Sequence, residues 1–298
     1  MLLSHSMKSF SRKDLIILIF LTIFWGLNWP IMKIGVENYP PLSFRVLGMF
    51  GGILVLLIYS HIKNLSLRIE KNQIAEVIKL AIPNMLFWHT FIILSIKLLT
   101  SGRAAILGYT MPIWALLSSS IIFRDKIKIY HIFGILLAML GAFFLLSSEI
   151  TSLIGRPLGT ILALIAAAAW GLGTAMMKRT NLNISTVCLT FWMMVFTSII
   201  MSLMVLTFEY KYIRLPTMIE LLTILYNSIL IFGFAHVAWF RLARILPPAA
   251  SSLSIMFIPI IGTFSGSFIL NEVHYWQDYI SILLIIFAMS TVMSPIKK

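Results

Sequence analysis

WGLNWPIMK at residues 25–33 and WGLGTAMMK at residues 170–178 decide the fold, because they are one pattern that occurs twice, 145 residues apart. Farther along the chain the offset becomes 147 residues, with matches of Leu42-Ser43-Phe44 to Leu189-Thr190-Phe191, Phe87 and His89 to Phe234 and His236, Pro112 to Pro259, and Asp125 to Glu272. An offset that stays constant apart from a single two-residue insertion indicates an internal duplication. We therefore predict two repeats, residues 14–147 and residues 155–294.

The composition places most of the chain in lipid. Of its 298 residues, 60% are hydrophobic and 11% are charged, whereas a soluble domain carries about 25% charged residues. A helix that spans a bilayer needs about 20 mostly apolar residues, and the sequence holds ten such segments. Their expected ranges are 15–33, 43–62, 76–97, 104–123, 129–146, 158–177, 184–208, 218–240, 247–270 and 276–293. We predict an all-α polytopic membrane protein with ten transmembrane helices.

The number of spans in each repeat fixes how the repeats are related. Each repeat holds five predicted spans, and an odd number means that the two repeats enter the membrane in opposite directions. Such halves are related by a pseudo-two-fold axis in the membrane plane, and inverted repeats of this kind are typical of secondary transporters. They offer two nearly equivalent states that face opposite sides of the membrane. The duplication therefore favours transport by alternating access.

The net charge of +13 has a simpler explanation than a nucleic-acid partner. Lys and Arg collect in the cytoplasmic loops of membrane proteins, and no basic run alternates with aromatic residues as a nucleic-acid surface needs. With the N-terminus in the cytoplasm, sixteen basic residues fall on the inner side and six on the outer side. We predict that both termini are cytoplasmic and that the chain binds no nucleic acid.

One face of the first span carries the first candidate site residues. Trp25, Asn28, Trp29 and Met32 follow the i, i+3, i+4, i+7 spacing of a helix face. Asn28 is polar and deep in an apolar helix. A polar side chain there needs a partner, which is either a neighbouring helix or a water-filled cavity. We predict a substrate-binding wall, against the alternative of helix packing with one interhelical hydrogen bond. Trp170 opens the matching face of the sixth span.

His89 and His236 form a second candidate pair, at equivalent positions of the two repeats. Each lies eight residues before a basic helix end, Lys97 or Arg244, which is about 12 Å at about 1.5 Å per residue. Because the inverted axis puts those ends on opposite faces, both histidines should lie near the midplane. Intramembrane ionisable residues indicate functional sites, so we predict substrate binding or proton coupling. The alternative is a neutral imidazole bonded to a backbone carbonyl. Trp88 and Trp239 flank the histidines, and they either stack on a flat ligand or serve as packing or interfacial residues.

Prolines and helix ends place the remaining candidates. Tyr109 lies one turn before Pro112, where we expect it either to face the cavity or to pack. Pro30, Pro112 and Pro259 disturb helix hydrogen bonds, and we predict kinks that serve as hinges. Arg45 sits two or three residues inside the outer end of its span, and the cheaper explanation is that its side chain extends to the interface. The alternative is contact with an anion such as a substrate carboxylate.

The sequence lacks the residue patterns that several kinds of chemistry require. No Asp or Glu lies deep in any predicted span, which disfavours a carboxylate-coupled cation pump and favours neutral, zwitterionic or anionic substrates. The chain has no Gly-x4-Gly-Lys-Ser/Thr phosphate loop, no cluster with metal-site spacing and no evident Ser–His–acid set. We therefore predict no catalytic residues, no metal, no cofactor and no enzymatic activity.

The order of the short motifs resembles that of a known family. The chain is similar to the two EamA-type repeats of the drug/metabolite transporter superfamily over residues 14 to 294, in Trp25-Gly26, Pro40-Pro41, Pro112 with Asp125 thirteen residues later, Pro259 with Glu272 thirteen residues later, and Trp239-Phe240-Arg241-Leu242-Ala243-Arg244. Two positions depart from the family pattern. Gly48 stands where the family has an arginine, and Asp125 stands where it has a glutamate. The first departure removes support for any substrate role carried over from that arginine.

This resemblance implies ten helices, cytoplasmic termini and a central cavity lined mainly by the first, third, fourth, sixth, eighth and ninth spans. It implies alternating access of amino acids or related small zwitterions, a lipid bilayer as surroundings and a bacterial inner membrane as location; a homodimer is one assembly that it allows. Two alternatives stay open. One is an intramembrane lipid-modifying enzyme, which needs a buried nucleophile beside His89 or His236, and the other is a membrane sensor that transports nothing.

Overall fold

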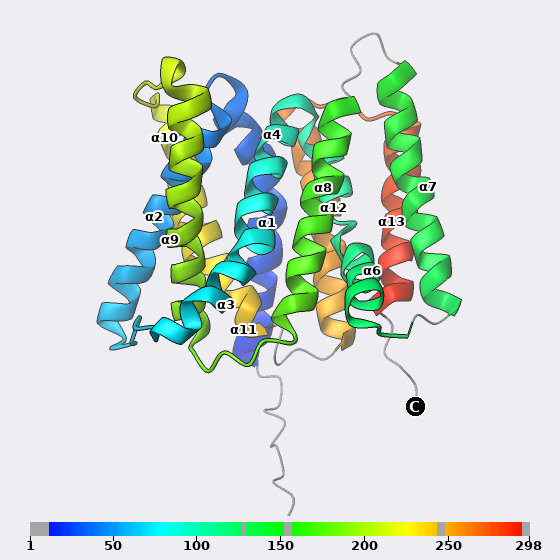
Figure 1. The fold of residues 1–298 in the computed structure, drawn as a ribbon. Coiled ribbons are helices and arrows are strands. Elements are labelled where there is room, and N and C mark those ends of the chain that lie inside the picture. Colours follow the sequence, from blue (N-terminus) through cyan, green and yellow to red (C-terminus); the bar gives the residue numbers. More distant parts are fainter. Residues whose placement is uncertain (1–11, 127–128, 152–156, 243–247, 294–298) are drawn as a thin grey trace, which may run out of the picture.

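The computed structural model describes residues 12–126, 129–151, 157–242 and 248–293, and every regular element within these ranges is a helix (Figure 1). Bounds predicted at residues 155, 247 and 294 lie outside the described residues. The elements in chain order are α1 (Arg12–Glu37), α2 (Pro41–Ile62), α3 (Lys71–Ala81), η1 (Ile82–Phe87), α4 (Trp88–Leu98), α5 (Ser101–Gly108), α6 (Met111–Phe123), α7 (Ile129–Thr151), α8 (Pro157–Met177), α9 (Thr186–Met204), η2 (Val205–Glu209), η3 (Tyr210–Tyr212), α10 (Met218–Tyr226), η4 (Asn227–Ala235), α11 (His236–Leu242), α12 (Pro248–Leu270) and α13 (Trp276–Met293).

Seven helical stretches of the described chain are long and apolar enough to cross a membrane: Arg12–Glu37, Pro41–Ile62, Lys71–Leu98, Ser101–Phe123, Pro157–Met177, Thr186–Tyr212 and Met218–Leu242. Shorter apolar stretches lie in α7, α12 and α13, at His131–Phe144, Phe257–Leu270 and Trp276–Thr291. A helix satisfies its own backbone hydrogen bonds, which lipid cannot do for it. The prediction of an all-helical polytopic membrane protein is confirmed, and the number of ten spans stays a prediction.

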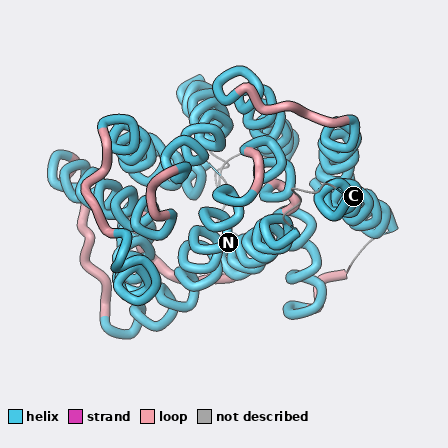
Figure 2. The backbone as a smooth tube through the Cα atoms, turned by 90° about the horizontal axis from the view of Figure 1, so that it is seen from above, coloured by secondary structure: helices cyan, strands magenta, loops and turns pink. Residues whose placement is uncertain are grey.

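The long helices stand side by side, with α1 in the middle of the bundle (Figure 1). Figure 2 shows the same bundle from above, with helices packed around a central region. α1 contacts α4 and α5 on one hand and α10 and α12 on the other, so it touches both predicted repeats. One such contact is the Tyr226 hydroxyl, which donates to the carbonyl of Phe24 at 2.8 Å. The middle of the bundle is therefore built from segments that are distant in sequence.

The face at which α1 ends, which we call the far face, carries a reciprocal pair of lysine contacts. Lys33 Nζ donates to the carbonyls of Ile96 and Leu99 at 3.0 and 2.7 Å. Lys97 Nζ donates to the carbonyl of Glu37 at 2.7 Å. Each lysine thus satisfies carbonyls at the C-terminus of the other helix, where no intrahelical partner exists. These contacts, which we call the lysine clasp, tie the ends of α1 and α4 together.

Two carboxylates close the same far face by crossing between the predicted repeats. Glu209 accepts hydrogen bonds from the backbone N–H and the hydroxyl of Ser43, each at 2.7 Å, near the start of α2. Glu272 accepts from the N–H and the hydroxyl of Ser101 at 2.6 and 2.9 Å, at the start of α5. A carboxylate is favourable at a helix N-terminus because the first N–H groups of a helix have no partner within it. The far face is therefore held by contacts at the ends of four helices.

Three stretches are wound as π-helix: η1, η2 and η4. η1 runs directly into α4, which carries His89 as its second residue, and η4 runs directly into α11, which begins at His236. π-turns are rare and occur often at functional sites. The two π-stretches before the histidines match at the 147-residue offset, a similarity that the sequence pattern did not predict.

The predicted hinge prolines differ in their surroundings. α5 ends at Gly108 and α6 begins at Met111, so Pro112 lies in the first turn of a new helix. α1 continues through Pro30 and α12 continues through Pro259 without interruption. The span predicted at 104–123 therefore consists of two helices, α5 and α6, and the first of them begins at Ser101. The third span begins earlier than its predicted range of 76–97, because α3 starts at Lys71.

Candidate functional site

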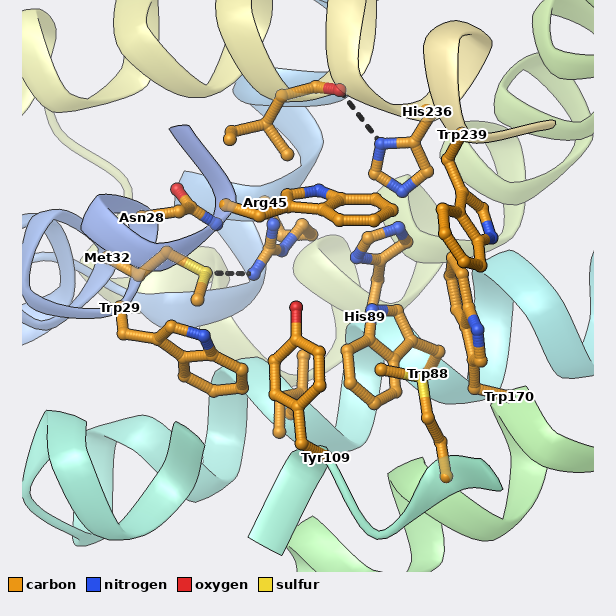
Figure 3. A pocket seen from close by; sticks show the side chains of 14 residues that line it. Asn28, Trp29, Met32, Arg45, Trp88, His89, Tyr109, Trp170, His236 and Trp239 are labelled. Carbon is orange, nitrogen blue, oxygen red and sulfur yellow. Dashed lines mark hydrogen bonds between the residues drawn. The ribbon is translucent and has the colours of Figure 1, made fainter. Parts of the chain in front are cut away.

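A central cavity of about 60 Å³ lies where α1, α2, α4, α8 and α11 meet (Figure 3). It is lined by Trp25, Asn28, Trp29, Met32, Arg45, Trp88, His89, Ile92, Tyr109, Met111, Trp170, Ile231, His236 and Trp239. All eight residues that the sequence analysis selected for substrate binding are among them. The structure thus brings these residues together, while their role in binding stays a prediction.

α1 contributes one continuous stripe to the cavity wall. Trp25, Asn28, Trp29 and Met32 line the cavity, as their helical spacing predicts. Asn28 is 6% exposed, and its Oδ1 is buried with no hydrogen-bond partner among the described residues. The alternative reading, in which this amide bonds to a neighbouring helix, therefore lacks its acceptor contact. Trp29 packs edge-on against Tyr109, with 6.1 Å between ring centroids.

The two histidines lie against each other at the centre of the site. The rings of His89 and His236 are 5.3 Å apart between centroids, and each residue is 2% exposed. His236 Nδ1 lies 2.9 Å from the carbonyl oxygen of Ile231. Because a carbonyl only accepts, Nδ1 carries the hydrogen and Nε2 is left as an acceptor without a partner. The carbonyl-bonded alternative thus holds for one nitrogen of His236, whereas neither nitrogen of His89 has a partner among the described residues.

Indole rings surround the histidine pair. Trp88 and Trp170 are 5.1 Å apart between ring centroids, and Trp25 and Trp239 are 5.7 Å apart. Trp170 also meets the ring of His236 edge-on at 6.0 Å. Aromatic rings prefer offset or edge-to-face contacts with other rings. This wall therefore suits a ligand with a flat apolar group.

Arg45 is the residue that the sequence analysis placed wrongly. It is 1% exposed and lines the cavity (Figure 3). Its Nη2 lies 2.9 Å from the sulfur of Met32, its Nη1 lies 3.4 Å from Oδ1 of Asn227, and its guanidinium is 5.7 Å from the ring centre of Phe232. The side chain does not extend to the interface, because residues of α1 and η4 contact its guanidinium. Counting residues from a helix end could not show these contacts.

Tyr109 reaches the cavity because the helix stops beside it. It follows the last residue of α5, is 4% exposed, and points its hydroxyl toward Arg45 in Figure 3. Three other lining residues were not named from the sequence: Ile92, Met111 and Ile231. Helical spacing from His89 is a signal for Ile92, which lies three residues farther along the same helix. We find no sequence signal for Met111 and Ile231.

The chemistry of the lining is that of a binding site. The described residues that line the cavity include no serine, threonine, cysteine, lysine, aspartate or glutamate, and Tyr109 supplies their one hydroxyl. The lipid-enzyme alternative needs a buried nucleophile beside a histidine, and this wall offers none with the usual reactivity. One permanent positive charge, several unpaired polar atoms and five tryptophans remain. Such a wall can recognise a small ligand by charge and shape.

Proteins with similar sequences are named as membrane transporters. A model of the EamA-like transporter family matches residues 13–147 and 157–294. The chain is 26% identical over 260 residues to the uncharacterized transporter YoaV of Bacillus subtilis, covering 86% of this chain and 88% of that protein. It is 26% identical over 273 residues to the uncharacterized inner membrane transporter YedA of Escherichia coli K12, covering 90% and 86%.

Two further similarities are more limited. A probable amino-acid metabolite efflux pump of Escherichia coli K12 is 23% identical over 170 residues, which is 57% of this chain and 54% of that protein. A protein of known crystal structure superposes with a TM-score of 0.67 at 18% identity, over 95% of this chain and 98% of its own. At that identity the likeness shows the fold alone.

Proposed function

Because the chain belongs to the EamA-like transporter family, we propose that it is a secondary transporter whose central cavity binds a small metabolite and opens to each side of the membrane in turn. The cavity carries the proposal, since its lining comes from both ranges that the family model matches. Asn28 and His89 come from the first range, and Trp170 and His236 from the second. A ligand held between two halves is released to one side or the other when the halves rock.

The proposed mechanism needs two halves that are inverted copies of each other. We divide the chain at residues 14–147 and 155–294, with five spans in each half. Support comes from the two ranges of the family match and from the π-stretch that precedes the histidine in each range. In Figure 1, α1 begins at the face where α8 ends, as inverted copies would. The hinge role of Pro112 is supported by the helix break beside it.

The contacts at the far face support a conformation closed on that side. The lysine clasp joins the ends of α1 and α4, and both helices also supply cavity residues. Opening the far side would require these hydrogen bonds to break. Lys33 matches Lys178 at the first offset, and Lys178 is exposed at the opposite face with no side-chain hydrogen bond in the described part of the chain. The difference fits a transporter closed on one side.

The substrates we propose are amino acids or related small zwitterions. Arg45 provides a positive charge for a carboxylate, and Asn28 Oδ1 and His236 Nε2 provide acceptors for an N–H group. The similarity to a probable amino-acid metabolite efflux pump points the same way over part of the chain. A cavity of about 60 Å³ holds about four water-sized groups. A whole amino acid therefore enters only if the lining side chains move apart.

We place the protein in a bacterial inner membrane with both termini in the cytoplasm, which makes the far face the outer one. The relative named as an inner membrane transporter supports the membrane, and the sixteen-to-six distribution of basic residues supports the orientation. A homodimer stays a prediction from the family resemblance.

Counterflow in proteoliposomes tests the proposed function. Vesicles loaded with one unlabelled metabolite should accumulate the same labelled metabolite transiently, and the panel should hold amino acids, nucleosides and carboxylates. We expect saturable accumulation for at least one compound, with none in empty vesicles. A folded, inserted protein that gives no signal across the whole panel would contradict a transporter and favour the sensor.

A further inference from the structure

Arg45 is a buried cation without an acidic partner. Within the described residues its contacts are a thioether, an amide oxygen at 3.4 Å and one aromatic ring, and its Nε makes no hydrogen bond. A buried charge is costly unless it is paired and hydrogen-bonded. The guanidinium of arginine also keeps its charge, because it is effectively never deprotonated in proteins. The fold therefore leaves a charge that a ligand can neutralise.

The other arginines of the described chain are treated differently. Three are exposed, Arg12, Arg68 and Arg124. The rest pair with carboxylates, in Arg103–Asp278, Arg179–Asp125, Arg214–Glu220 and Arg241–Asp14. Arg45 is the most deeply buried of all, at 1% exposure, and it alone among them faces the central cavity. The missing acid is thus specific to the site.

The remaining unpaired atoms around the cavity are neutral. Asn28 Oδ1, His236 Nε2 and both nitrogens of His89 have no hydrogen-bond partner in the described ranges. They can give or take single hydrogen bonds, but the lining holds no carboxylate to neutralise an ammonium group. A negative group on the ligand therefore meets a fixed charge, whereas a positive group meets only dipoles and aromatic faces.

We propose that Arg45 anchors the carboxylate of the transported molecule, and that this carboxylate, rather than an amino group, is what the site requires. The inference rests on the proposed function and changes its substrate class from zwitterions to monocarboxylates that carry a flat apolar group, with the amino group dispensable. The planar guanidinium matches a carboxylate in two parallel hydrogen bonds. The two pairs of indoles in the cavity wall supply flat surfaces for the apolar group.

The size and charge of the cavity limit the ligand further. A volume of about 60 Å³ holds about four water-sized groups, so a carboxylate with a whole ring enters only when the lining side chains move apart. Arg45 is the one permanent charge among the lining residues, so a second carboxylate would remain unpaired against a mostly apolar wall. Dicarboxylates and phosphate esters with two negative charges should therefore be excluded.

A binding titration on the purified full chain in nanodiscs tests the inference, with tryptophan fluorescence as the signal because indoles line the cavity. The ligands are 3-phenylpropionate, which lacks the amine, phenylalanine, which has both groups, and phenylalaninamide, which lacks the carboxylate. We expect the first two to differ by less than about fivefold, as for a hydrogen bond to neutral groups. The amide should bind at least about 30-fold more weakly, as for loss of a buried charge pair.

Variants of α2 identify the residue responsible. Arg45→Gln should remove the preference for a carboxylate, whereas Lys63→Gln, an equal loss of charge at the exposed end of the same helix, should keep it. Equal binding of amide and acid to the unaltered protein would overturn the inference, and so would a lack of binding by every carboxylate. A folded Arg45→Gln protein with an unchanged preference would overturn the role of Arg45.

The outcomes for transport and for the anchor are distinguishable. Counterflow that shows no preference for carboxylates would overturn the inference and leave the transporter in place. Carboxylate-selective binding without flux of any compound would overturn the transporter and leave the anion site in place.

Discussion

Arg45 and Arg103 are both buried arginines of the first matched range, and they differ in what neutralises them. Arg103 is 8% exposed, and its Nε donates to a carboxylate oxygen of Asp278 at 2.7 Å. Arg45 is 1% exposed and has a thioether and a distant amide oxygen as its partners. Both charges were taken out of water, at a cost that only pairing offsets. Arg103 therefore joins two helices, whereas Arg45 is available to bind an anion.

The positions of the two arginines fit this division. Arg103 joins α5 to the start of α13, at the far face, where both partners belong to the fold itself. Arg45 reaches the cavity between the two matched ranges, beside the histidine pair and Tyr109. A paired charge in the cavity could not also bind a ligand. Removing the charge of Arg45 should therefore reduce transport, whereas removing the charge of Arg103 should reduce the stability of the fold.

The largest effect should come from Arg45→Gln on transport. Removing one partner of a buried, hydrogen-bonded charge pair costs about 2–5 kcal/mol of binding, so flux at low substrate concentration should fall at least about 30-fold. Initial rates in proteoliposomes measure this fall, with Lys63→Gln as the control. Flux within twofold of the unaltered protein would remove the distinction between the two arginines.

The next effect concerns the stability of the fold, which should fall more for Arg103→Gln than for Arg45→Gln. Arg103→Gln leaves the buried carboxylate of Asp278 without its cationic partner, which should destabilise the fold by about 3 kcal/mol. Arg45→Gln removes an uncompensated charge and should leave the melting temperature unchanged or raise it. Thermal unfolding of both variants in the same detergent checks the order. A lower melting temperature for Arg45→Gln than for Arg103→Gln would mean that Arg45 has the structural role.

A smaller effect is expected at the lysine clasp. In a Cys188→Ser background, Ile92→Cys places a thiol in the cavity wall, and a membrane-impermeant thiol reagent added on the far side reports access. Replacing Lys33 and Lys97 together by alanine should raise the labelling rate several-fold, because the C-terminal carbonyls of α1 and α4 lose their shared donors. Unchanged labelling in this folded variant, compared with Lys63→Ala, would show that the clasp does not close the far side.

The smallest effect should follow Tyr109→Phe. The hydroxyl lies at the cavity beside Arg45 (Figure 3), and one hydrogen bond to a ligand contributes about 0.5–1.5 kcal/mol. The apparent affinity in the fluorescence titration should therefore fall by about two- to tenfold, with the carboxylate preference intact. A loss as large as that of Arg45→Gln would assign the anchoring role to the phenol.

Much of the site could be predicted because it follows local periodicity and repetition. The spacing of Trp25, Asn28 and Trp29 puts them on one helix face, and the 147-residue offset connects His89 with His236 before any contact is known. The all-helical membrane fold follows from apolar runs of spanning length. These signals depend on neighbours in sequence, which are available without the structure.

Arg45 shows what such signals miss. Its guanidinium contacts residues of α1 and η4, and its partner Asn227 is 182 residues away in the sequence. Whether an arginine near a helix end extends outward or is buried depends on those distant elements. The π-stretches and the helix break at Tyr109 are similar cases, because backbone winding depends on tertiary packing. The lack of an Asp or Glu deep in any predicted span was the available hint that Arg45 has no internal partner.

Counterflow of labelled 3-phenylpropionate and phenylalaninamide in proteoliposomes tests the central claim most directly, with the unaltered protein, Arg45→Gln and Lys63→Gln reconstituted in parallel. We predict transient accumulation of the acid by the unaltered protein and by Lys63→Gln, little by Arg45→Gln, and no accumulation of the amide by any of the three. Equal accumulation of acid and amide, or full activity of Arg45→Gln, would contradict a cavity that recognises its substrate through an unpaired arginine.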